Sequence, residues 1–150
     1  MLFSSSKTDW ETPQTLFDEL NAEFRFTLDA AASATNHKCA RYFTEEDDGL
    51  AQDWGGEIVF CNPPYGSVAT GVWTKKCFDE SRKPNTTVVL LIPARTCRKS
   101  FHEYCYNKPG TEIRFLKGRL RFEVDGVPGE AAPFPSMVVV FRNPVNRRCA

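Results

Sequence analysis

The stretch from Ile58 to Gly66 constrains this chain more than any other. It reads Ile-Val-Phe-Cys-Asn-Pro-Pro-Tyr-Gly, four residues typical of a buried strand followed by an amide, two prolines and an aromatic ring. Each proline forces the residue before it out of the helical region and offers no backbone N–H. We therefore expect a strand that stops at a sheet edge where Asn62 emerges beside free backbone carbonyls, with Gly66 turning the chain away.

Asn62, Pro63 and Tyr65 together would suit a planar ring that carries an amino group. The lone pair of such an amine is delocalised into the ring, so the nitrogen attacks poorly until its N–H bonds are held out of conjugation. The Asn62 side-chain oxygen and the Pro63 carbonyl can each accept one N–H, and both bonds strengthen as positive charge grows on nitrogen. Tyr65 would stack on the ring. The alternative is a strand end closed by a diproline turn, with no chemistry.

Length and charge narrow the function further. The 150 residues suffice for one domain, and the net charge is zero. The charges are unevenly spread, however, with twelve acidic and three basic residues from Asp9 to Glu57, and eight basic against two acidic from Arg95 to Arg121. This asymmetry favours a local phosphate-facing surface over a general polycation. An ordinary solvated surface of mixed sign is the alternative.

The cysteines and histidines indicate neither a metal site nor secretion. The six cysteines have no paired short spacing and the two histidines complete no ligand pattern, so we expect no metal. The chain opens with no signal peptide and contains no apolar run long enough to span a membrane. We therefore expect reduced thiols in a cytoplasm and no membrane partner.

The hydrophobic pattern predicts one α/β domain over residues 10–142, between a polar N-terminal arm (1–9) and a basic tail (143–150). Helices are expected over 12–22, with Thr12 as the N-cap, over 72–81 and over 96–107. Strands are expected over 24–28, 58–61, 86–92 and 137–141, with 41–44 as a further option. Residues 112–116 and 120–124 form either a hairpin around Lys117-Gly118 or a strand and its exit loop.

Four motifs carry a resemblance to a known family. They are Trp10-Glu11-Thr12-Pro13, Phe26-Thr27-Leu28-Asp29-Ala30-Ala31-Ala32, Cys61-Asn62-Pro63-Pro64-Tyr65, and Gly118-Arg119-Leu120-Arg121-Phe122 followed by Phe134-Pro135-Ser136. From about Trp10 to Phe141 the chain resembles the small Dam-like N6-adenine DNA methyltransferases of phages and prophages. The resemblance implies a trimmed Rossmann-like fold, mostly a parallel sheet with an antiparallel closing strand. It also implies methyl transfer from S-adenosylmethionine to a flipped adenine in DNA, in the cytoplasm of a bacterial host.

The resemblance and the sequence pattern together assign three sets of residues. The catalytic set is Asn62, Pro63, Pro64 and Tyr65. The cofactor set is Trp10, Thr12, Pro13, Asp29, Ala30 and Asp48, with Glu45 as a weaker choice for the ribose. The nucleic-acid set is Arg95, Arg98, Lys99, Arg119 and Arg121. For the acids and the basic residues, turn capping and solvated surfaces are the competing interpretations.

Two features of the sequence keep other functions open. Alanines replace the glycine-rich turn of larger methyltransferases, and residues 35–54 leave room for little more than one of the two strands found there. A DNA-binding or decoy module without catalysis is therefore one alternative. A methyltransferase acting on glutamine or on an RNA amino group is another, because both also use the Asn-Pro-Pro-Tyr run. No segment is long enough to form a separate region that recognises a DNA sequence. Sequence specificity is therefore weak or is supplied by a dimer partner, so a homo-oligomer is a further option.

Overall fold

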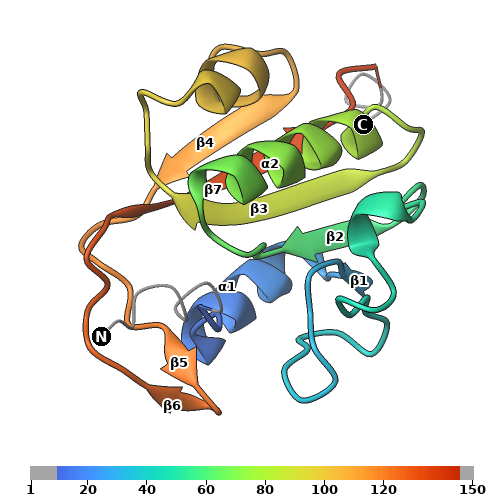
Figure 1. Ribbon diagram of the computed structural model, residues 1–150. Coiled ribbons are helices and arrows are strands. Elements are labelled where there is room, and N and C mark those ends of the chain that lie inside the picture. The colour runs from blue at the N-terminus through green and yellow to red at the C-terminus, as the bar shows by residue number, and fades with distance from the viewer. Residues whose placement is uncertain (1–9, 146–150) are drawn as a thin grey trace.

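The computed structural model describes residues 10–145 and places them around a five-stranded sheet (Figure 1). Its strands, in the order β1-β2-β3-β7-β4, are β1 (Leu28–Asp29), β2 (Ile58–Cys61), β3 (Thr87–Pro93), β7 (Ser136–Arg142) and β4 (Thr111–Phe115). The first three run parallel, and β7 is antiparallel to both of its neighbours. The predicted α/β fold, a mostly parallel sheet with an antiparallel closing strand, is confirmed.

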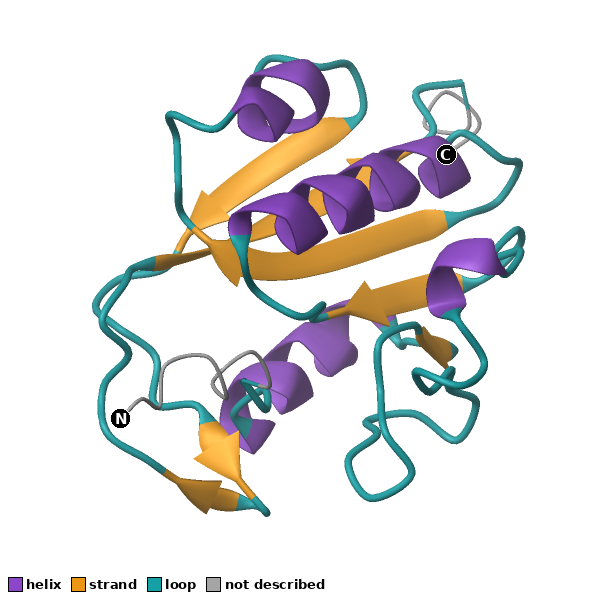
Figure 2. Cartoon of the chain, in the orientation of Figure 1, coloured by secondary structure: helices purple, strands orange, loops and turns teal. Residues whose placement is uncertain are grey.

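The two long helices, α1 (Gln14–Phe24) and α2 (Ser67–Ser81), cover opposite faces of the sheet (Figure 2). Consecutive residues of a strand point to opposite faces. On β2, the ring of Phe60 lies 5.2 Å from Phe17 of α1, whereas the next residue, Cys61, hydrogen-bonds Cys77 of α2. Both faces of the sheet are therefore covered, which explains why its central strands are apolar throughout.

The strands β3 and β7 form the centre of the core. Residues 88–93 of β3 and 136–141 of β7 are all buried, and the two strands pair along their whole length, from Thr87 with Arg142 to Pro93 with Ser136. β7 also pairs with β4, so it joins the parallel strands to the last strand of the sheet. The carboxyl ends of β1, β2 and β3 consequently meet at one edge, where Asn62 follows β2.

Both ends of α1 differ from the predictions. Pro13, not Thr12, occupies the N-cap position, and the N-cap residue itself contributes no capping side chain. The helix continues to Phe24 and ends where Arg25 adopts a left-handed conformation with φ 57°. The predicted strand over 24–28, ending at Asp29, is present only at its end, since Phe24 belongs to α1 and only Leu28 and Asp29 pair with β2.

Three other segments are less regular than their patterns predict. The optional strand over 41–44 is reduced to one bridge, between Tyr42 and Asp29, and the only helix between 30 and 57 is the 3-10 turn η2 (Gly49–Ala51). The predicted helix over 96–107 is wrong as a continuous element, because it contains a loop and the π-helical turn η3 (Phe101–Cys105). Of the two options for the next segment, the exit loop is the one found, over residues 116–122. A different hairpin follows this loop and consists of β5 (Glu123–Val124) and β6 (Val127–Pro128).

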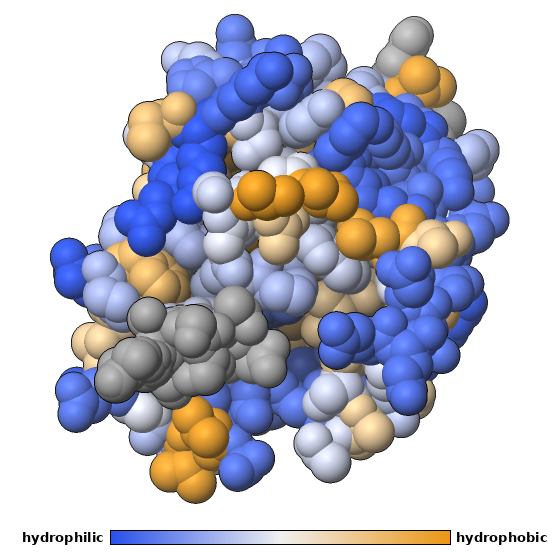
Figure 3. All heavy atoms as spheres, viewed as in Figure 1, coloured by the Kyte–Doolittle hydropathy of each residue, from blue (hydrophilic) through white to orange (hydrophobic). Residues whose placement is uncertain are grey.

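The surface seen in Figure 3 is largely hydrophilic, with apolar patches over α2 and over the β5–β6 hairpin. The exposed valines of these elements are Val68 and Val72 on α2, and Val124 and Val127 on the hairpin. No helix within residues 10–145 is long and apolar enough to cross a bilayer. The same residues bring together no group of three side chains suited to hold a metal ion. The predicted arm (1–9) and most of the tail lie outside the described residues.

We expect Glu80→Ala to lower the free energy of unfolding by about 2–3 kcal/mol, because it leaves a buried donor unpaired. Glu80 is 6% exposed and accepts the backbone N–H of Trp54 at 2.7 Å, and it pairs with Lys76 and Lys83. Asp79→Ala, on the same helix but exposed, removes only a surface pair with Lys75 and should change stability by less than about 0.5 kcal/mol. Urea unfolding of both variants measures the difference. Equal losses would contradict this account.

Candidate active site

The side-chain amide of Asn62 is held in one orientation by groups from the N-terminal segment. Its Nδ2 donates to the carbonyl oxygen of Trp10 at 2.5 Å and to Oγ1 of Thr12 at 2.9 Å. A carbonyl oxygen can only accept, so the nitrogen of the amide must face Trp10 and the oxygen must face away. Thr12 is 3% exposed. Its hydroxyl is therefore used to orient Asn62 and not to cap α1.

Tyr65 contacts the other side of the same amide. Its hydroxyl donates to Oδ1 of Asn62 at 2.6 Å and lies 3.2 Å from the carbonyl oxygen of Leu91 on β3. Burial raises the pKa of Tyr65 well above its usual range, so the phenol remains protonated and acts as a donor. The Asn62 oxygen keeps a second lone pair, and no hydrogen bond within residues 10–145 occupies the carbonyl of Pro63. The two acceptors that the sequence predicts for an amino group thus stay available.

The ring of Tyr65 belongs to a cluster of four aromatic side chains, which we call the aromatic cluster: Trp10, Tyr65, Phe122 and Phe134. Every pair in it is in contact, with ring centroids 5.3 to 6.5 Å apart. Tyr65 is only 7% exposed. Its ring is therefore not the open stacking face that the sequence suggests. A base could stack on it only if the cluster opened.

Asp29 ends β1 as a buried carboxylate next to the strand that carries Asn62. It is 4% exposed. Its side chain accepts the backbone N–H of Lys38 at 2.9 Å and that of Ala31 at 3.4 Å. Burial raises the pKa of Asp29, and these two N–H groups and the nearby cations act in the opposite direction. The N–H of Ala30 donates to Phe60 of β2, which fixes this turn against the end of β2.

An open cavity of about 500 Å³ lies between the start of α1, the loop after β1 and the β5–β6 hairpin. Its charged lining residues are Glu11, Glu123, Asp125 and Lys38, with His37 beside them. The volume falls in the range of small-molecule sites, and the mixed charges suit a ligand that carries both signs. Glu11 lies between Trp10 and Thr12 in the chain, and Lys38 contacts Asp29. The cavity therefore adjoins both the Asn62 network and Asp29.

The remaining cofactor candidates lie around the same turn. Gly49 packs so closely on the carbonyl of Ala30 that a Cβ there would come within 2.3 Å of it. This contact brings the loop of Asp48 next to the end of β1. Asp48 itself is exposed, in a left-handed conformation with φ 58°, and its side chain caps nothing. Pro13 is buried beside Thr12. Glu45 is exposed in a turn.

The basic candidates border the aromatic cluster from two sides. The guanidinium of Arg95, in the loop after β3, lies 5.7 Å from the ring centre of Phe134, and Arg121 directly precedes Phe122 in the chain. Arg121 donates to the carbonyl of Gly129 at 3.3 Å. Arg119 and Lys99 are exposed. The predicted helical face that would have aligned Lys99 with neighbouring basic residues is absent, because that segment contains a loop and a π-helical turn.

The match to a known family decides the identity. Residues 2–149, nearly the whole chain, match the family model described as DNA N-6-adenine-methyltransferase (Dam). The chain belongs to this family. The resemblance stated from its four motifs is thereby confirmed, and the orientation of Asn62 becomes a feature of a Dam-family fold.

Two phage proteins are similar to this Dam-family chain. The DNA N-6-adenine-methyltransferase of Escherichia phage T1 is 30% identical over 119 residues, which cover 78% of this chain and 48% of that protein. The DNA N-6-adenine-methyltransferase of Haemophilus phage HP1 is 29% identical over 142 residues, 91% of this chain and 80% of that protein. The chain thus spans about half the length of the T1 protein and most of the length of the HP1 protein.

Three residues of the candidate site in this Dam-family chain were not predicted from the sequence: Phe122, Phe134 and Glu123. The two phenylalanines lie within its quoted motifs, yet only the arginines there were assigned a role. Glu123 is buried and its Oε2 accepts the first backbone N–H of α1, from Gln14, at 2.9 Å. An acid that stabilises a helix start from more than a hundred residues away leaves no local signal. Aromatic residues recurring in each motif were the signal for the cluster.

We expect Asn62→Asp to destabilise the fold at neutral pH by about 2–3 kcal/mol, because a carboxylate cannot donate to the Trp10 carbonyl. Protonating the new acid restores a donor, so its folded pKa should be raised. The stability deficit should therefore be small below about pH 4 and should grow as the pH rises through that raised pKa. Asn85→Asp, in an exposed turn, is the control. Thermal unfolding from acid to neutral pH provides the measurement, and a deficit independent of pH would argue against the assigned orientation.

Proposed function

We propose that this chain carries out the reaction of its family, the transfer of a methyl group to N6 of adenine in DNA, with S-adenosylmethionine as the donor. The observation that carries the proposal is the fixed amide of Asn62, whose oxygen faces away from Trp10. The next residue, Pro63, has a carbonyl that no hydrogen bond within residues 10–145 occupies. Two acceptors from consecutive residues at the end of β2 match the two N–H bonds of an exocyclic amine.

In this proposal the protein binds and orients the amino group of the adenine. The base leaves the duplex, and N6 donates one N–H to the Asn62 oxygen and the other to the Pro63 carbonyl, which makes its lone pair available. With its lone pair available, N6 would accept a methyl group from bound S-adenosylmethionine, whose sulfur would keep the electrons of the broken bond, and N6 would then release one proton to solvent. Both hydrogen bonds strengthen as N6 becomes positive, so they favour the transition state over the ground state.

Tyr65 contributes through its hydroxyl in this proposal. The phenol donates to the Asn62 oxygen, and the amide nitrogen is held by Trp10 and Thr12. The amide is thereby fixed on three sides before a base arrives, which lowers the entropy cost of reaching the reactive geometry. The ring of Tyr65 keeps the aromatic cluster together beneath the amide.

The residues around the end of β1 fit the proposed methyl donor. When bound, S-adenosylmethionine supplies an electrophilic methyl group on a positively charged sulfur. The buried carboxylate of Asp29 and the acidic lining residues Glu11 and Glu123 would balance its sulfonium and ammonium charges, and Lys38 would face its carboxylate. Asp48 is our candidate for the adenosine end. These assignments use the cavity lined by Glu11, which lies between Trp10 and Thr12 in the chain, and by Lys38, whose backbone N–H bonds Asp29.

Bound DNA would lie across the edge formed by the carboxyl ends of the strands. The arginines at 95, 119 and 121 border the aromatic cluster or the loop that leads into it, and phosphate contacts there would offset the few kcal/mol needed to flip a base. The two relatives come from phages of bacteria. We propose that this chain acts on DNA in a bacterial cytoplasm.

The direct test is incubation with labelled S-adenosylmethionine and unmethylated duplex DNA, followed by digestion to nucleosides. We expect the label on N6-methyladenine, and Asn62→Ala should lower kcat about a hundredfold because one transition-state contact is lost. Parallel reactions with RNA and with a glutamine-containing peptide distinguish the competing methyl acceptors. Label on cytosine, on RNA or on the peptide in place of adenine would refute the proposal, and unlabelled products would favour the decoy alternative.

The substitution Thr12→Val tests whether Thr12 orients Asn62 or contacts the methyl donor. The substitution keeps the shape of Thr12 but removes one acceptor of the Asn62 amide. We expect kcat to fall about tenfold, the worth of one hydrogen bond, while the Kd of S-adenosylmethionine changes less than twofold or so. Thr12→Ser should restore kcat. A raised Kd with an unchanged kcat would instead place Thr12 in the donor site.

Binding of the donor should depend on pH through Asp29. Because its pKa is raised in the free protein, Asp29 must lose a proton to face a cation, so affinity for S-adenosylmethionine should rise as the pH increases through that pKa. Asp29→Asn should bind more weakly and lose this pH dependence. Calorimetric titration at several pH values measures both effects. An unchanged profile in Asp29→Asn would show that another group titrates.

A further inference from the structure

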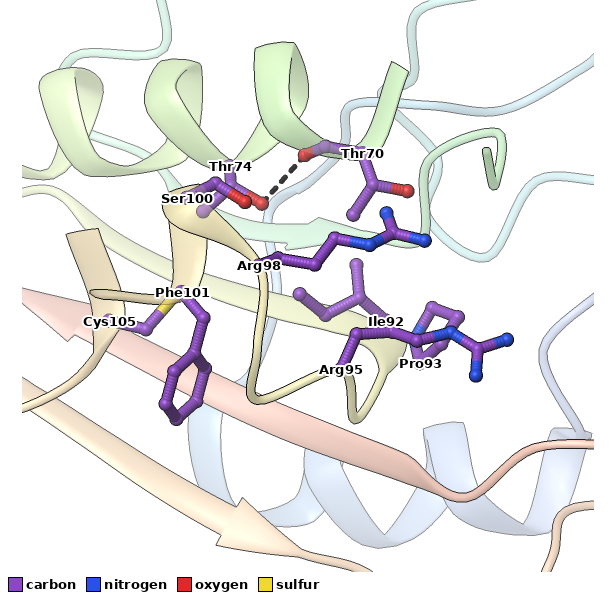
Figure 4. Close-up of a pocket in the computed structure, with 9 residues that line it drawn as sticks. All are labelled: Thr70, Thr74, Ile92, Pro93, Arg95, Arg98, Ser100, Phe101 and Cys105. Atoms are coloured by element: carbon purple, nitrogen blue, oxygen red, sulfur yellow. Dashed lines mark hydrogen bonds between the residues drawn. The ribbon is translucent and has the colours of Figure 1, made fainter. Parts of the chain in front are cut away.

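A small cavity lies between α2, the end of β3 and the loop that leads to η3 (Figure 4). Its volume is about 10 Å³, which is room for a single oxygen-sized atom. Thr70 and Thr74 of α2 line one side, and Arg95, Arg98 and Ser100 line the other. The hydroxyl of Thr74 is already used, since it donates to the carbonyl of Thr70 at 2.7 Å.

Thr70 brings an unused polar group to this cavity. The residue is 4% exposed, and its Oγ1 is buried without a hydrogen-bond partner within residues 10–145. A buried hydroxyl left unpaired is unfavourable, so a partner is expected in the working state of the protein. Because Thr70 lines the cavity, the missing partner can reach its hydroxyl there.

The other side of the cavity carries two positive charges without a counter-charge. Within residues 10–145, no carboxylate lies within 4 Å of the guanidinium group of Arg95 or of Arg98. Figure 4 shows the guanidinium group of Arg98 next to Thr70, whereas the side chain of Arg95 extends past Pro93. The backbone N–H of Arg95 donates to Pro93 and that of Arg98 to the carbonyl of Arg95, which holds the loop tightly against the end of β3.

The start of α2 adds partial positive charge at the same place. Gly66 is its N-cap and provides no capping side chain, and the first turn contains no acidic residue. The backbone N–H groups of the first turn therefore lack an acceptor from the helix itself. An uncapped helix start attracts anions. Combined with two unpaired guanidinium groups and an orphaned hydroxyl, it makes a site for an anion with several oxygens.

We propose that this constellation, the Thr70–Arg98 site, binds a phosphate of the DNA backbone. One phosphate oxygen enters the cavity and accepts from Thr70, while the guanidinium groups of Arg98 and Arg95 contact the others. The assignment to DNA rests on the proposed function, and it adds a specific backbone contact. Pro63, Pro64 and Tyr65 alone separate Gly66 from Asn62, so the bound phosphate would lie close to the flipped nucleotide and fix its position.

The test is binding of a fluorescent duplex oligonucleotide at KCl concentrations from about 50 to 200 mM. Arg98→Gln should weaken binding about tenfold at low salt and reduce the slope of log affinity against log salt by about 0.9, the value for one phosphate contact. Thr70→Val should weaken binding about threefold and leave the slope unchanged. Because a methyl group replaces an unpaired hydroxyl, its unfolding midpoint in urea should stay equal or rise.

Matched controls separate the site from general effects of charge and packing. Thr111→Val makes the same change at a second buried, unpartnered hydroxyl, on β4 and outside the cavity. Lys75→Gln removes a positive charge from the exposed face of α2 beyond the cavity. Both controls should bind the duplex like the wild type. Calorimetric titration with inorganic phosphate, for the wild type and Arg98→Gln, tests whether the site takes a free anion.

The outcomes distinguish this inference from the proposed function. If adenine is methylated but Arg98→Gln and Thr70→Val bind DNA like their controls, the phosphate site is wrong and the function stands. If the two variants show the expected losses but no adenine is labelled, the site stands and the function fails. If inorganic phosphate binds through Arg98 while DNA affinity is the same in all variants, the site belongs to a free anion and the inference is overturned. Both proposals fail if the wild type does not bind DNA.

Discussion

The hydrogen bond from the Asn62 amide to the carbonyl of Trp10 is the contact on which the candidate active site depends. It joins the first described residue of the chain to the end of β2, and it determines which atom of the amide faces outward. A backbone carbonyl cannot be changed by substitution of its own side chain, so this restraint depends on where the N-terminal segment lies. That segment is held in turn by the ring of Trp10, which contacts three other aromatic residues.

The aromatic cluster explains why motifs far apart in the sequence act together. Trp10 precedes α1, Tyr65 follows β2, and Phe122 and Phe134 flank the β5–β6 hairpin, so four separate segments meet in one set of ring contacts. Edge-to-face ring pairs have definite geometry and add to the area they bury. The cluster therefore fixes the backbone around Asn62 more firmly than the short strands β1 and β2 could alone. Arg95 and Arg121, which lie next to these rings, are therefore placed at the same edge of the sheet as Asn62.

The sequence predicted the parts of the fold that depend on local pattern. The apolar runs gave β2, β3 and β7 to within a residue or so, because strands buried on both faces leave continuous hydrophobic stretches. The errors occurred where distant contacts override local preference. Thr12 looks like a helix cap but its hydroxyl bonds Asn62, and Phe24 has strand propensity but completes α1. The sequence assigned Asn62 to catalysis and Trp10 and Thr12 to the cofactor, yet it could not show that all three share one hydrogen-bond network. It also could not show that Tyr65 would be enclosed by rings contributed from residues 122 and 134.

The position of β7 has a consequence for how the protein is made. This last strand lies between β3 and β4, so neither of them has its full set of backbone partners until residue 142 has left the ribosome. Up to that point β3 exposes an apolar edge able to pair with other chains. Closure of the sheet joins segments about fifty residues apart, a pairing that slows folding. The segment from β1 to β4 must therefore wait, incompletely folded, for β7, and the nascent chain is most prone to aggregation just before β7 emerges.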